Sequence, residues 1–104
     1  MYRATTPTLS YTFTGASPDD FADILIIISQ NGECLITRHK DGCTIEEDKV
    51  SIELTQEEAN LLTEGVARTQ IRGITPGGKV HASRVIEFNT EDVLSDEILE
   101  VPDE

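Results

Sequence analysis

A chain of 104 residues is long enough for one domain with a hydrophobic core and too short for two. Its formal net charge of −12 argues against binding to nucleic-acid phosphates, and no apolar run reaches the roughly 18 residues that a membrane span needs. Three Phe, two Tyr and no Trp leave Ile, Val and Leu to build the core, which favours strands. The N-terminus lacks the apolar stretch of a signal peptide, so we expect a complete product made in the cytosol.

The first predicted strand covers residues 8–14, where Leu9, Tyr11 and Phe13 alternate with Thr and Ser. This period of two is typical of a half-buried strand, and we place its aromatic face toward the core. The preceding residues 2–7 carry no such pattern and are expected to form a loose leader.

The second predicted strand, residues 23–30, contains an uninterrupted aliphatic run and is apolar on both faces, as in a central strand covered on both sides. In so small a domain the second face, which holds Leu25 and Ile27, requires a cover. That cover could be the short helix, the C-terminal tail or another subunit. An Asn-Gly dipeptide at 31–32 is preferred in type I′ hairpins, so residues 33–39 should return antiparallel.

A short helix is predicted at about residues 55–63. Thr55 and Glu58 fit a capping box, in which each side chain bonds the other residue's backbone N–H, and Gly65 can end the helix in a left-handed cap. The remaining strands are expected at residues 43–46, 49–54, 66–75 and 79–89.

The whole pattern predicts an all-β fold, a small antiparallel Ig-like β-sandwich of six to seven strands with one short helix. A closed barrel is the alternative. We expect a single domain over residues 1–89, followed by an acidic amphipathic tail over 90–104.

The tail has seven acidic residues and no basic one. Apolar residues are spaced among the acids, as in a segment that docks onto another surface. In the strand at 66–75, Arg68 and Arg72 should share one face. They could complement the tail, form a docking patch or, most simply, pair across strands with Glu87 or Glu53.

No catalytic, cofactor-binding or metal-binding constellation is recognisable, so an enzyme is not expected. Cys34, His39, Cys43 and His81 could in principle bind zinc, but their spacing is not that of a zinc site. Cys34 and Cys43 flank one predicted hairpin, where a disulfide is conceivable, although two reduced thiols are the default for a cytosolic chain. The sequence leaves this pairing open.

The run SIELTQEEANLLTEGVARTQIRGITPGGKVHASRVIEF, residues 51–88, resembles small prophage-encoded proteins related to the N-terminal domain of phage baseplate upper proteins. The leading TPTLSYTFT and the closing EDVLSDEIL extend the resemblance to nearly the whole chain. The chain departs from the pattern at Gly73, at Arg84 and in its strongly acidic tail. The resemblance implies a β-sandwich that is made in the bacterial cytoplasm and then built into the virion tail, near the baseplate or tail tip.

The first hypothesis is therefore a structural or interaction protein of a phage tail, which forms homo-oligomers and docks to a neighbouring tail protein, with no nucleic-acid or membrane partner. Its expected partner-binding residues are Leu25, Ile27, Arg68, Arg72, Val93, Leu94, Ile98 and Leu99. The alternative is a carbohydrate- or cell-surface-binding module. Sugar platforms normally need exposed aromatic rings, for which Tyr2, Phe21 and Phe88 are the candidates.

Overall fold

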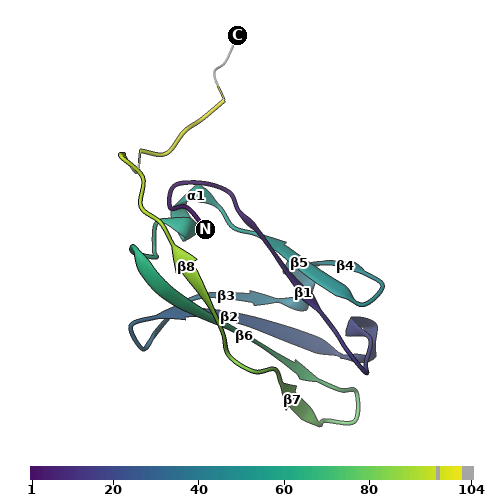
Figure 1. Cartoon of the computed structure of the whole chain (residues 1–104). Coiled ribbons are helices and arrows are strands. Elements are labelled where there is room, and N and C mark those ends of the chain that lie inside the picture. The colour runs from purple at the N-terminus through teal and green to yellow at the C-terminus, as the bar shows by residue number, and fades with distance from the viewer. Residues whose placement is uncertain (96, 102–104) are drawn as a thin grey trace.

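The computed structural model describes residues 1–95 and 97–101. Two antiparallel sheets pack face to face (Figure 1), one of three strands in the order β1-β5-β4 and one of five in which β3, β2 and β6 are neighbours and both β7 and β8 pair with β6. This confirms the predicted all-β sandwich with one short helix. The strands and the helix are β1 (Thr8–Thr12), β2 (Asp23–Gln30), β3 (Glu33–His39), β4 (Thr44–Glu46), β5 (Lys49–Glu53), α1 (Gln56–Ala59), β6 (Gly65–Ile74), β7 (Val80–Ala82) and β8 (Ile86–Thr90).

The described residues form eight strands rather than six or seven, because the last predicted strand is divided into β7 and β8. Arg72 pairs with Ala82 in β7 and Thr69 pairs with Ile86 in β8, so two residues of β6 face three residues between the partner strands. Within this bulge the N–H of Ile71 donates to the side-chain oxygen of Ser83 (3.1 Å). The Ser83 hydroxyl therefore accepts the hydrogen bond that a backbone carbonyl of the neighbouring strand would accept in a regular sheet. The regular pairing is interrupted at this point, and the predicted strand divides in two.

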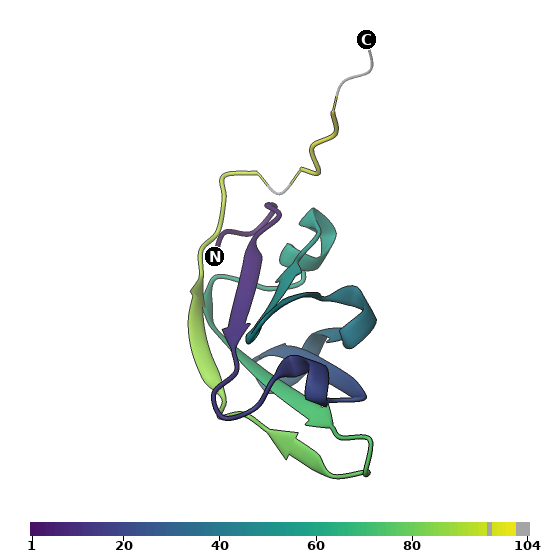
Figure 2. The same cartoon turned by 90° about the vertical axis from the view of Figure 1, so that its right-hand side faces the viewer.

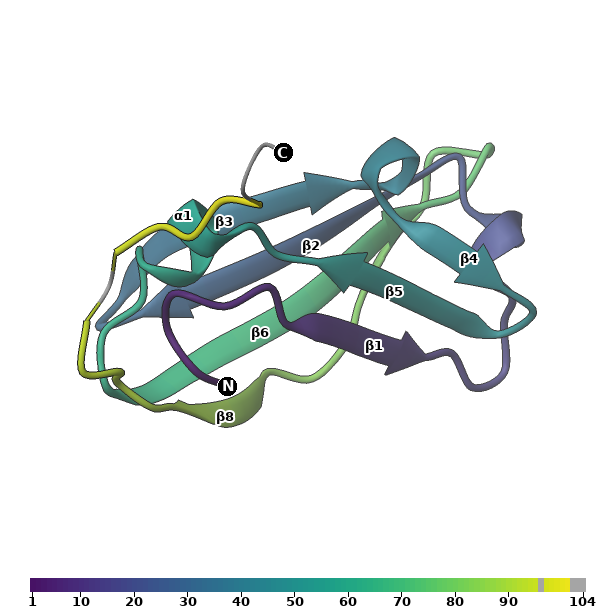
Figure 3. The ribbon, with the colours of Figure 1, turned by 90° about the horizontal axis from the view of Figure 1, so that it is seen from above.

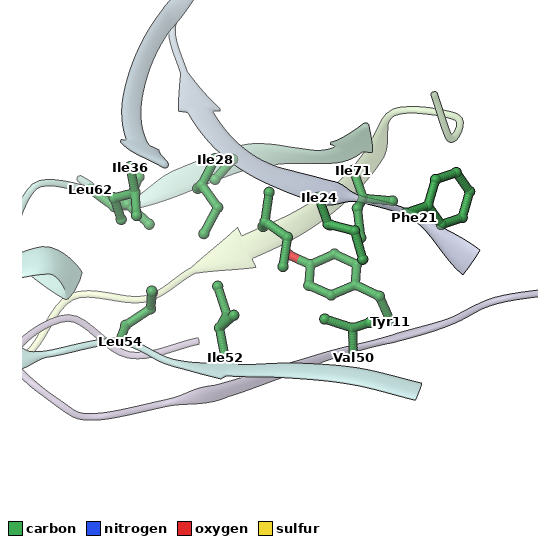
Figure 4. Packing of buried hydrophobic residues seen from close by; sticks show 12 residues of the cluster. Tyr11, Phe21, Ile24, Ile28, Ile36, Val50, Ile52, Leu54, Leu62 and Ile71 are labelled. Carbon is green, nitrogen blue, oxygen red and sulfur yellow. The ribbon is translucent and has the colours of Figure 1, made fainter. Parts of the chain in front are cut away.

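The hydrophobic core fills the space between the two sheets (Figure 4), and β2 contributes most to it. Ile24, Ile26 and Ile28 are at most 1% exposed. The strand lies between β3 and β6, which confirms the central position predicted for it, although only one of its faces is fully buried. The turn after β2 has positive φ at both Asn31 (55°) and Gly32 (78°), as a type I′ hairpin requires. The core cluster also contains Tyr11, Phe21, Ile36, Val50, Ile52, Leu54, Leu62, Ala67 and Ile71.

Helix α1 begins as predicted but ends early. The N–H of Glu58 donates to the Thr55 hydroxyl (3.1 Å) and the N–H of Thr55 donates to the Glu58 carboxylate (3.0 Å), which is the predicted capping box. The C-cap is Asn60, so the prediction that Gly65 ends the helix was wrong. The carbonyls at the helix end are bound by Arg3, whose Nε donates to Leu62 O (2.6 Å) and whose terminal nitrogen donates to Asn60 O (3.3 Å).

The prediction of a loose leader was also wrong. Tyr2 forms a parallel bridge with Glu91, and the Arg3 N–H donates to Glu91 O (2.9 Å). Arg3 also pairs with Asp92 through atoms 2.7 Å apart. Figure 2 shows the purple N-terminus lying beside the end of β8. These partners are far away in the sequence, which is why no local pattern marked the leader as ordered.

One buried hydrogen bond joins the sheets and makes stability depend on pH. The Tyr11 hydroxyl lies 2.7 Å from the Thr69 hydroxyl, which donates to Ile27 O (3.0 Å). Tyr11 is therefore the donor, and burial raises its pKa above the usual 10.0. A raised pKa means that the contribution of neutral Tyr11 is fully present below about pH 10 and is lost as the pH rises through the folded-state pKa.

We expect Tyr11→Phe to lower the free energy of unfolding by about 1 kcal/mol at neutral pH, because one buried hydrogen bond is lost. We also expect it to reduce the fall in stability above pH 10. Urea denaturation between pH 7 and pH 11 measures both effects. The sequence has two tyrosines, so tyrosinate absorbance in a Tyr2→Phe background reports the titration of Tyr11 alone. An identical alkaline loss in Tyr11→Phe and wild type would contradict this role.

Candidate interaction surface

The outer face of the five-stranded sheet is the surface opposite the core. Along β6, Ala67, Thr69 and Ile71 are buried while the residues between them point outward. The register then aligns Leu25, Arg72 and Ala82 in one row across β2, β6 and β7, and places Ile74 beside Val80 in the next row. We call the following residues the outer patch: Leu25, Ile27, Arg72, Ile74, Val80 and Ala82.

Within the described residues, no layer covers this face. The three-stranded sheet and α1 both lie on the inner side of the five-stranded sheet (Figure 1). Leu25 and Ile27 are half-buried, whereas Ile74 is 38% and Val80 is 53% exposed. A shallow hollow of about 220 Å³ runs between Leu25, Arg72, Ile74 and Val80. Of the three covers proposed for Leu25 and Ile27, the short helix is thus excluded.

The two arginines on this face differ in their partners. Arg68 lies directly across from Glu87, with Nε 3.4 Å from a carboxylate oxygen, in agreement with the simplest of the three interpretations. Arg72 is exposed, and its side chain forms no ion pair in the described part of the chain. Asp23, at the rim, accepts a hydrogen bond from His39 (2.9 Å), and this bond lowers the pKa of the carboxyl group. The carboxylate of Asp23 is therefore already bonded to His39, whereas the guanidinium of Arg72 is available to form an ion pair with another molecule.

The tail residues predicted to belong to the same site lie elsewhere. The side-chain amide of Gln56 bonds both backbone groups of Leu99 (2.8 and 2.7 Å), so the tail passes over α1 (Figure 3). Val93 is half-buried, whereas Leu94 and Leu99 are exposed. The tail of the same chain, as far as it is described, therefore does not cover Leu25 and Ile27. The structure separates the predicted site into an outer-face half and a tail half.

Sequence reasoning missed an aromatic cleft between the loop after β1 and the strands β6 and β7. Its volume is about 490 Å³, and Phe13, Phe21 and His81 line it. The Phe21 ring stands edge-on to both neighbours, with ring centroids 5.7 Å from Phe13 and 6.1 Å from His81. The lining residues come from separate elements, and Gly73 was marked only as a departure from the resembling proteins. No local signal identified this cleft.

The three aromatic candidates for a sugar platform do not form one. Phe21 is buried at 9% exposure, Phe88 is partly buried and Tyr2 is 55% exposed. Tyr2 pairs with Glu91 just beyond β8, which lies along the first half of β6, whereas Phe21 contacts Gly73 near the other end of β6. Tyr2 and Phe21 therefore lie at opposite ends of the sandwich.

The described residues contain no cluster of three His, Cys, Asp or Glu side chains that could hold a metal ion. Cys34 is exposed and Cys43 is half-buried, and both are free thiols. The Cys43 thiol donates to His39 O (3.3 Å), and burial raises its pKa. His81 lines the aromatic cleft, and neither cysteine is among the residues that line it.

Fold and surface together define an all-β sandwich in which the five-stranded sheet has an apolar outer face that no layer of the described residues covers. No protein-family model, curated protein or solved structure significantly matches the chain. Among the described residues, no helix is both long and apolar enough to cross a bilayer. A function must therefore be inferred from the surface itself.

Proposed function

We propose that this chain is a non-enzymatic structural or interaction protein that docks to a partner protein through the outer patch. The observation that carries this proposal is the central strand β2, which is buried on one face and apolar on the other, where residues 1–95 and 97–101 provide no covering layer. As the setting we propose the tail of a phage or prophage, at the baseplate or tail tip, with the chain made in the bacterial cytoplasm. This setting rests on the sequence resemblance alone.

The composition of the outer patch supports docking. The cores of protein interfaces are rich in apolar side chains and arginine and poor in other charged residues. Here Leu25, Ile74 and Val80 surround Arg72, whose planar guanidinium can bind a carboxylate through two parallel hydrogen bonds. The patch lies on the paired strands β2, β6 and β7, so its side chains are held in place before a partner arrives.

Tail particles purified after prophage induction in the source bacterium test both parts of the proposal. We expect mass spectrometry to find the chain at constant stoichiometry. We expect Val80→Asp to remove it from particles, because a charge then replaces an apolar contact in the interface. Val85→Asp is the matched control, since Val85 is equally exposed (52% against 53%) but lies between β7 and β8 outside the patch.

Circular dichroism of both purified variants would confirm that they keep the β-sandwich. Absence of the wild-type chain from particles would overturn the phage setting. Equal incorporation of Val80→Asp and wild type would overturn docking through the outer patch.

A further inference from the structure

We infer that the outer patch of one copy of this chain binds the acidic tail of a second copy, residues 91–101. The inference rests on the proposed docking role of the patch and names its occupant. Four observations support it: the exposure of the tail, its path, its charge and the free guanidinium of Arg72.

The acidic tail carries aliphatic side chains that lie largely in water. Leu94, Leu99 and Val101 are at least 71% exposed, and no strand or helix includes them. So many aliphatic side chains in water favour burial against another surface. The bonds between Gln56 and Leu99 hold only the backbone and leave these side chains available.

The path of the tail directs it away from the patch of its own chain. The tail follows Thr90, which pairs with Gly65 at the start of β6, whereas Ile74 of the patch ends the same strand. At about 3.3 Å per residue, these two ends are roughly 30 Å apart. The tail then turns over α1, on the side of the sandwich opposite the outer face (Figures 1 and 3). A second copy can present its tail without this constraint.

The charges of the two surfaces are complementary. Alternate side chains share a face when a segment binds as an extended chain, so Glu97, Leu99 and Val101 would then point the same way. This face offers one carboxylate and two aliphatic groups, while the patch offers Arg72 among aliphatic side chains. Arg72 is one of only eight basic residues in a chain of net charge −12, and its guanidinium forms no ion pair in the described residues. An acidic partner therefore meets an available cation there.

Two measurements on the full-length chain test the inference. Sedimentation equilibrium gives the dissociation constant for self-association, and fluorescence anisotropy gives the affinity for a labelled peptide of residues 90–104. We expect Arg72→Glu to weaken both by about tenfold or more, because like charges then meet in the interface. The matched control Lys49→Glu makes the same charge change on the exposed face of the other sheet and should alter both by less than about twofold.

Charge exchange provides the specific readout. A chain with Arg72→Glu should regain affinity for a peptide that carries Glu97→Arg, which wild type should bind less well than the native peptide. No self-association at any accessible concentration, or binding unaffected by Arg72→Glu, would overturn the inference. The proposed function would survive that outcome if Val80→Asp still removed the chain from particles. Conversely, the chain could associate through its tail and yet be absent from phage particles. That result would overturn only the phage setting and would leave the inference intact.

Discussion

Truncation of Ile26 to alanine is expected to lower the free energy of unfolding by about 3 kcal/mol, whereas truncation of its neighbour Ile27 should cost about 1 kcal/mol. Ile26 is 1% exposed and belongs to the core cluster, so the lost methyl groups leave a cavity between the two sheets. Ile27 is half-buried on the outer face, where water can fill the space. Urea denaturation followed by far-UV circular dichroism measures both changes.

This pair tests the fold and the uncovered face together, because residue type, strand and truncation are identical. The measurements belong at low protein concentration, where association is minimal. An equal cost at both positions would show that the outer face is covered, either by another copy or by part of the same chain. At higher concentration, we expect the cost of Ile27→Ala to rise if the second copy docks there, since a ligand that binds only the folded state adds to stability.

Gly73→Ala is the second change with a large expected effect, a loss of about 1–3 kcal/mol from overpacking. A methyl group on Gly73 would lie 2.7 Å from the nearest atom of the Phe21 ring. That ring is buried and held edge-on between Phe13 and His81, so it cannot turn away freely. The effect is steric. Thermal and urea denaturation measure it.

Gly77→Ala is the matched control, because its added methyl group would meet nothing closer than 3.8 Å. We expect it to change stability by less than about 0.5 kcal/mol. In a Phe21→Leu background, Gly73→Ala should cost less than in wild type, since a shorter side chain leaves room for the methyl group. Additive costs in this double-mutant cycle would contradict the contact between Phe21 and Gly73.

Much of the fold could be predicted from the sequence because its signals are local. Alternation placed Tyr11 in the core, and the aliphatic run of β2 marked a central strand. The capping box at Thr55 and Glu58 and the hairpin after β2 likewise depend on residues a few positions apart. Each of these patterns lies within one strand, helix or turn, and the spacing of apolar residues predicts the structure of such a single element.

The errors all involve contacts between distant segments. Arg3 binds carbonyls about 60 residues away in the chain and thereby orders the leader and ends α1. The hydroxyl of Ser83 breaks the last strand by bonding Ile71. Neither side chain differs from an ordinary surface residue until its partner is known. Propensity and pattern cannot supply that knowledge.

Only part of the candidate site could be predicted, because local patterns mark some of its residues and contacts between distant segments determine the others. Leu25 and Ile27 were found because β2 is apolar on both faces, and Arg72 because β6 alternates. Val80 was missed, because its place in the patch depends on the register between β6 and β7. The position of the tail relative to this face also depends on tertiary contacts, here those between Gln56 and Leu99.

The neighbours of β2 also determine how exposed the chain is to aggregation while it folds. β3 follows after a two-residue turn, so this hairpin can form early, whereas β6 arrives only some 35 residues after β2. Until it does, residues 24–28 present an open, aliphatic strand edge of the kind that nucleates intermolecular sheets. Asp23 at one end of the run and the net charge of −12 oppose that association. The acidity of this chain thus protects its most hydrophobic strand during synthesis and refolding.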